Sequence, residues 1–90
     1  MTREQLRTAS EELRMASEGA ATPEMERRLH DQSNQFATLA TAEHGPDHGR
    51  LARHLNALKE IREEAGDEVT EHVEKAEEAI TAYRETVEGV

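Results

Sequence analysis

The side chains best suited to chemistry lie in residues 44–55, which read HGPDHGRLARHL. Histidine nitrogens and carboxylate oxygens are ligands of zinc and related metal ions. A Gly-Pro step separates the first two histidines, so they are not expected on one helical face. The chain also has no Glu-x-x-His and no His-Glu-x-x-His motif, the helical signatures of di-iron and zinc sites. A metal or small-ligand site at this corner is therefore the alternative hypothesis, with candidate ligands His44, Asp47, His48 and His54.

Helix ends explain the same residues without any ligand. His44 would favour the negative end of a helix dipole, and Gly45 with Pro46 would stop that helix. Asp47 would then cap the helix that follows, because an aspartate oxygen accepts from free backbone N–H groups. On this interpretation the segment is a corner between two helices, and no metal or cofactor is expected.

Breaks of the same kind divide the whole chain into four segments. Threonine, aspartate and proline stand where helices would begin, and glycines stand where they would end in left-handed conformation. No segment alternates polar and apolar residues with a period of two, so no strand is expected. The pattern predicts one domain over residues 1–90, with helices at 3–18, 23–44, 48–65 and 68–88.

The apolar faces of these segments predict an all-α fold, in which antiparallel helical hairpins form a small four-helix bundle. The fourth helix carries apolar residues at 4-3-4-3-4 spacing from Val69 to Val87. Polar side chains interrupt the other faces at Gln32, His54 and Arg62. The first helix has mainly alanines on its apolar face, so we expect it to be the most loosely held. Helices one and two could close the bundle within one chain, but the polar interruptions favour completion by a homodimer.

The charge balance limits the classes of partner. Twenty acidic residues face eleven basic ones, giving a net charge of −9. Such a surface repels nucleic acid and anionic lipid, so neither is expected as a partner. Nine of the eleven basic residues are arginines, and abundant carboxylates with little lysine suit a cytoplasm of molar salt. The chain has no cysteine and no apolar run of membrane-spanning length, which supports a cytoplasmic location.

One basic stretch stands out in this acidic chain. No acid occurs between Asp47 and Glu60, whereas Arg50, Arg53 and Lys59 are all present. We interpret this stretch as a docking surface for an acidic partner, such as the glutamate-rich face of a second copy. No spacing suggests an activated nucleophile, and no acid is expected on an apolar face, so no catalytic residue is predicted. The predicted interaction residues are Arg50, Arg53, His54 and Arg62.

Residues 49–85 contain Gly-Arg-Leu at residues 49–51, Ala-Gly at 65–66 and Tyr-Arg-Glu at 83–85. With these features the segment resembles the C-terminal helical hairpin of small acidic proteins of halophilic archaea, a family of unknown function. The resemblance implies an all-helical fold and a high-salt cytoplasm, and it brings no activity or site residues. We therefore predict a non-enzymatic, self-associating helical interaction module, with a further protein partner that the sequence does not identify.

Overall fold

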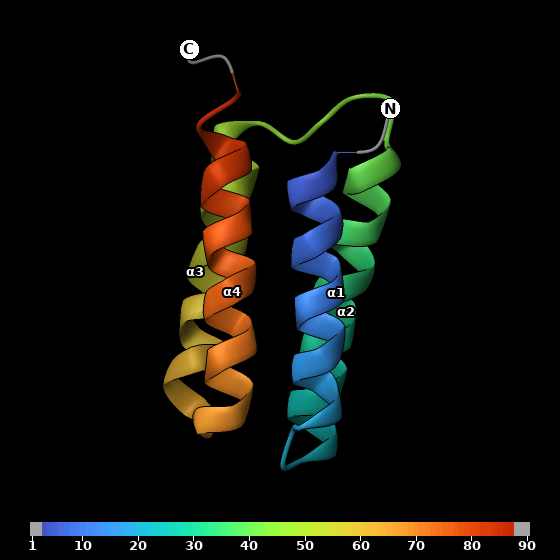
Figure 1. Cartoon of the computed structure of the whole chain (residues 1–90). Helices are drawn as coiled ribbons and strands as arrows, with labels where there is room; N and C mark the ends of the chain where they lie inside the picture. The colour runs from blue at the N-terminus through green and yellow to red at the C-terminus, as the bar shows by residue number, and fades with distance from the viewer. Residues whose placement is uncertain (1–2, 88–90) are drawn as a thin grey trace.

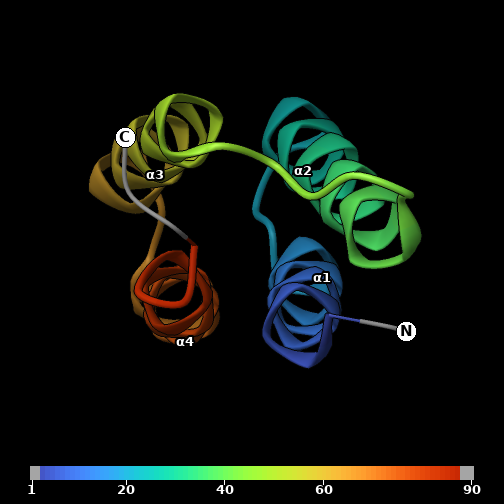
Figure 2. The ribbon, with the colours of Figure 1, turned by 90° about the horizontal axis from the view of Figure 1, so that it is seen from above.

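The structure is a computed structural model that describes residues 3–87. It contains four helices, α1 (Glu4–Glu18), α2 (Pro23–Thr41), α3 (His48–Glu64) and α4 (Asp67–Arg84), and no strand over this range. Two antiparallel hairpins, α1–α2 and α3–α4, lie side by side (Figures 1 and 2). The predicted all-α bundle is therefore confirmed, and helices one and two lie against the second hairpin within one chain. The predicted fourth helix runs to residue 88, whereas α4 ends at Arg84 and residues 85–87 form a turn; residue 88 itself lies outside the described residues.

Side-chain caps set the beginnings of two helices, as the sequence indicates. The Thr22 hydroxyl accepts a hydrogen bond from the Met25 backbone N–H at 3.1 Å, at the start of α2. Asp47 Oδ1 accepts from the Arg50 N–H at 2.8 Å, at the start of α3. Each bond satisfies a backbone donor that the first helical turn leaves free.

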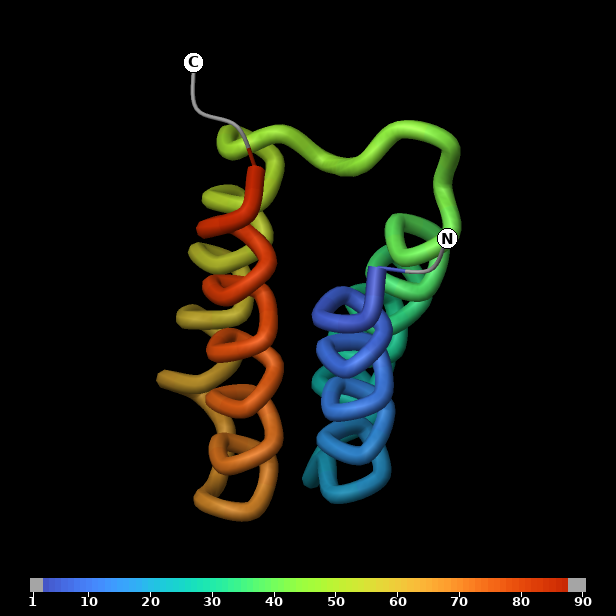
Figure 3. Tube along the Cα trace, turned by 45° about the horizontal axis from the view of Figure 1, so that its top comes forward, coloured from blue at the N-terminus to red at the C-terminus, as the bar shows by residue number. Residues whose placement is uncertain are grey.

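The end of α2 differs from the prediction, because the helix stops at Thr41 and not at residue 44. Residues 42–47 must cross from one hairpin to the other, and Figure 3 shows this segment spanning the end of the bundle. A helical residue advances about 1.5 Å and an extended one up to about 3.6 Å, so a helix that continued to residue 44 would shorten the reach of the crossing segment. His44 is consequently exposed in the crossing segment and does not occupy the helix end.

Arg3 occupies the position at the end of α2 that His44 was expected to hold. Its guanidinium Nη1 donates to the backbone oxygens of Leu39 at 3.1 Å and Ala42 at 2.8 Å. The Arg3 backbone N–H also donates to Ala40 O at 2.9 Å. A cation at a helix C-terminus satisfies free carbonyls and complements the dipole. The start of the chain therefore fixes the end of the first hairpin.

The left-handed glycines expected at helix ends do not occur in residues 3–87. The Gly19 N–H instead donates to Ala16 O at 3.1 Å, which tightens the last turn of α1 at a φ of −96°. Gly66 precedes α4 in extended conformation, with a φ of −78°. These two turns therefore do not require glycine for its backbone freedom.

The expectation that the first helix is the most loosely held is wrong. The close helix pairs among the described residues are α1–α2, α1–α4 and α3–α4, so α1 packs on two neighbours. Its small residues allow this close approach, and Leu6 and Leu13 are fully buried. Ser10 and Ser33 also exchange hydrogen bonds across α1–α2, each hydroxyl donating to the other residue's carbonyl oxygen at 2.8 Å.

Candidate functional site

The candidate metal ligands do not converge. His44 is exposed, and Asp47 caps α3. His48 Nδ1 accepts from Arg84 Nε at 3.2 Å, so its other ring nitrogen carries the proton and donates to Val87 O at 3.2 Å. His54 is buried nearly two turns further along α3. Residues 3–87 hold no group of three or more acidic or histidine side chains that could bind a metal ion.

The structure pairs two polar side chains that interrupt predicted apolar faces on different helices. His54 is 7% exposed, and its Nδ1 donates to Gln32 Oε1 at 2.8 Å. Its ring also lies against Phe36, with 4.7 Å between ring centroids. Burial lowers the pKa of His54 from 6.5, and the positive charges of Arg50 and Arg53 lower it further. His54 therefore belongs to the α2–α3 contact as a neutral, hydrogen-bonded side chain.

Arg62 also has its partner within the chain. Its Nε lies 2.9 Å from Glu77 Oε1, and its Nη2 donates to Glu77 Oε2 at 3.5 Å. The Nε–H does not point at the carboxylate, so this contact is an ion pair without an aligned hydrogen bond at Nε. His54 and Arg62 are thus both accommodated inside one chain, and they no longer argue for a dimer.

Two glutamates are more enclosed than the sequence analysis expected. The Glu77 side chain is 19% exposed, and the Glu12 side chain is 16% exposed. Glu12 Oε1 lies 2.8 Å from His72 Nδ1, which joins α1 to α4. Helical periodicity places each glutamate at the edge of an apolar face but gives no signal for a partner on another helix. Both side chains bridge helices, and Glu77 also lines an open groove of about 540 Å³.

The other two predicted interaction residues, Arg50 and Arg53, lie exposed on α3. No carboxylate of the described chain lies within 4.0 Å of either guanidinium. By contrast, Arg28 pairs with Glu64 at 3.2 Å and Arg7 with Glu11 at 3.9 Å. Arg50 and Arg53 are therefore accessible cations on an acidic protein.

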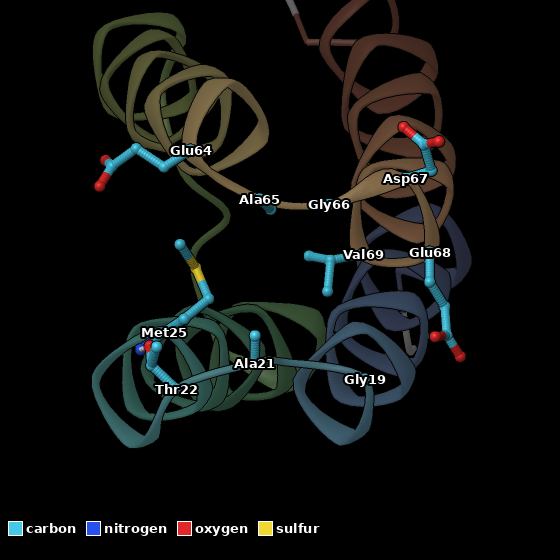
Figure 4. Close-up of a pocket in the computed structure, with 10 residues that line it drawn as sticks. All are labelled: Gly19, Ala21, Thr22, Met25, Glu64, Ala65, Gly66, Asp67, Glu68 and Val69. Atoms are coloured by element: carbon cyan, nitrogen blue, oxygen red, sulfur yellow. Dashed lines mark hydrogen bonds between the residues drawn. The ribbon is translucent and has the colours of Figure 1, made fainter.

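A small pocket of about 260 Å³ lies between the α1–α2 and α3–α4 turns, at the opposite end from the crossing segment. Figure 4 shows Met25 and Val69 directed into it, whereas the carboxylates of Glu64, Asp67 and Glu68 point away. A binding site usually combines an apolar lining with a few convergent polar groups. Because its carboxylates do not converge, this pocket offers no catalytic or ion-binding arrangement.

None of the helices, as far as the structure describes them, is long and apolar enough to cross a membrane.

Comparisons with known proteins give a family but no activity. No curated protein and no solved structure matches the chain. The model of DUF7553, a family of unknown function, matches residues 1–86. The chain therefore belongs to the family DUF7553.

Proposed function

We propose that this protein is a non-enzymatic helical interaction module that self-associates in a high-salt cytoplasm. The observation that carries the proposal is the exposure of Arg50 and Arg53, which have no carboxylate partner among residues 3–87, on a chain of net charge −9. A second copy offers abundant carboxylates to these arginines. Complementary charges steer encounter and fix the orientation of two surfaces, even where each ion pair adds little affinity.

Molecular mass tests the self-association directly. We expect light scattering behind a sizing column to give a dimer mass at about 1 M KCl, the salt of the proposed cytoplasm, and also at about 0.15 M KCl. Charges in direct contact are screened less at either salt concentration than the repulsion between more distant acidic groups. A wild-type mass of one chain at every protein concentration would refute self-association.

A charge-reversed variant tests the two arginines. Changing Arg50→Glu together with Arg53→Glu should shift the mass towards a monomer. The matched control changes Arg14→Glu and Arg27→Glu, two exposed arginines of α1 and α2, and alters the net charge by the same amount. The control should keep the wild-type mass. An equal shift towards the monomer mass in both variants would attribute the weaker association to net charge and not to Arg50 and Arg53.

The high-salt part of the proposal rests on the excess of acidic residues. Repulsion among carboxylates destabilises the folded chain in dilute buffer, and molar salt shortens the Debye length to about 3 Å. We therefore expect the melting temperature to rise between about 0.15 M and about 1 M KCl. A constant or falling melting temperature would contradict adaptation to molar salt.

A further inference from the structure

One exposed face of α3 carries charges in an order that its own helix does not favour. Positions 50, 53, 57, 60 and 64 follow a 3-4-3-4 spacing and so share one face of the helix. We call this face the α3 strip; it consists of Arg50, Arg53, Ala57, Glu60 and Glu64. Ala57 is partly exposed, and the four charged residues are exposed.

The order of charges along the α3 strip is unfavourable for an isolated helix. Arg50 lies in the first turn, at the positive N-terminal end of the dipole, and Glu64 lies in the last turn, at the negative C-terminal end. Arg50 and Arg53 are three residues apart, and Glu60 and Glu64 are four apart, so like charges are neighbours. Helix stability therefore does not explain the arrangement, whereas a partner surface would.

The four charges are nearly symmetric about Ala57. Arg50 lies seven residues before it and Glu64 seven after, while Arg53 lies four before and Glu60 three after. Two antiparallel copies of α3 related by a two-fold axis near Ala57 would place each arginine pair opposite the glutamate pair of the other copy. Such an interface is isologous, because one patch is complementary to itself. The small Ala57 side chain allows the two helices to approach at the axis.

We infer that the α3 strip is the surface through which two copies of this chain associate, antiparallel and related by a two-fold axis near Ala57. The inference rests on the self-association proposed above and names its surface and symmetry. Glu64 also contacts Arg28 of its own chain at 3.2 Å, but its side chain remains 59% exposed. It can therefore accept a second cation.

The acidic groove between α3 and α4 provides a competing location for Arg50 and Arg53 of another copy. It has a volume of about 540 Å³ and is lined by Glu74, Glu78 and Glu85 together with the Arg62–Glu77 ion pair. Docking of the arginines there would join two different surfaces, a head-to-tail contact that continues from copy to copy unless the rotation closes a ring. In a two-fold dimer, in contrast, the α3 strip of each copy is covered by that of the other, so no third copy can bind there. Mass therefore distinguishes the two arrangements.

A charge-swap experiment tests the α3 strip. One variant, Arg50→Glu with Arg53→Glu, makes the strip wholly acidic, and the other, Glu60→Arg with Glu64→Arg, makes it wholly basic. Each variant alone should dimerise at least about tenfold more weakly than wild type, since like charges then face each other. An equimolar mixture of the two should form a heterodimer, because an acidic strip then faces a basic one.

Folding is checked in the same samples. The four changes are at exposed positions, and Arg50→Glu and Glu64→Arg bring the charge of a terminal turn into agreement with the helix dipole, so far-UV circular dichroism should stay that of wild type. The variant that combines all four changes provides a second check. Its strip has the reversed order of charges, remains self-complementary and should form a homodimer.

The outcomes separate the α3 strip from self-association in general. Recovery of a dimer mass only in the mixture, and in the four-change variant, supports the two-fold contact. Wild-type dimerisation that persists in both two-change variants rejects the α3 strip but leaves self-association standing. A monomeric wild type rejects both proposals. A wild-type mass that grows beyond two copies rejects the two-fold arrangement in favour of a head-to-tail contact.

Discussion

The hydrogen bond between Gln32 and His54 gives the most specific prediction about stability. Gln32→Met removes the acceptor and keeps a side chain of similar shape, which leaves the Nδ1–H of a buried histidine without a partner. An unsatisfied buried donor costs about 1 to 3 kcal/mol. His54→Leu removes the donor, and the partly exposed Gln32 can then turn to water. The double variant should consequently lose less stability than the two single losses added together.

The same pair predicts a pH dependence whose sign follows from burial. The pKa of His54 is lowered from 6.5 by burial and by Arg50 and Arg53, so below pH 6.5 the unfolded chain takes up a proton that the folded chain resists. The stabilisation by neutral His54 is therefore complete above pH 6.5 and is lost as the pH falls towards the lowered pKa. Between about pH 7.5 and about pH 5.5 the loss is at most about 1.4 kcal/mol.

Urea unfolding, followed by far-UV circular dichroism at about pH 7.5 and about pH 5.5, measures the coupling energy between Gln32 and His54 and the pH-dependent loss of stability. The four proteins of the Gln32 and His54 cycle should give a coupling energy of about 0.5 to 3 kcal/mol. The pH-dependent loss attributed to His54 should be absent from His54→Leu and present in the control His44→Gln, because His44 is exposed. A coupling energy near zero, or the same pH dependence in wild type and His54→Leu, would refute this account of the α2–α3 contact.

Three further variants and one control test other features of the fold by urea or thermal unfolding. Glu77→Ala should cost about 1 kcal/mol, since it deprives the partly buried Arg62 of its carboxylate, whereas Lys75→Ala on the exposed side of α4 should cost less than about 0.5 kcal/mol. Equal losses of stability in Glu77→Ala and Lys75→Ala would show that partial burial does not strengthen the Arg62–Glu77 ion pair. Ser33→Ala removes the hydroxyl from the reciprocal hydrogen bonds across α1–α2 and should lower the free energy of unfolding by about 1 to 2 kcal/mol. An unchanged urea midpoint would show that these hydrogen bonds make no net contribution to stability. Gly66→Ser should raise the melting temperature by about 4 °C, because Gly66 has a negative φ and caps α4 without a side-chain acceptor, and a fall would contradict that backbone conformation.

The existence of the four helices could be predicted from the sequence because periodicity and capping residues are local signals. Thr22 and Asp47 act as caps in the way their residue types suggest. The end of α2 could not be predicted in the same way. It depends on the distance between two hairpins and on Arg3, which reaches the last carbonyls of α2 from 36 to 39 residues away in the sequence.

The polar side chains of the core illustrate the same limit. Periodicity alone identifies Gln32 and His54 as interruptions of apolar faces, but their hydrogen bond depends on how α2 and α3 are aligned in space. The sequence does not indicate that Glu12 and Glu77 are partly buried, because each lies at the edge of an apolar helix face, where glutamates are common. The exposed arginines of α3 were identified directly, since an interval without acids is visible in the chain itself.

The central position of α1 has a consequence for the order in which the protein opens. This helix has close neighbours on two sides, whereas α3 packs closely on α4 and contacts α2 through long side chains, in the pairs His54–Gln32 and Glu64–Arg28. Amide protons of α3 should therefore exchange with solvent before those of α1, through a partial opening that leaves the other three helices together. A second copy bound along α3 would slow exchange in the helix that opens most readily.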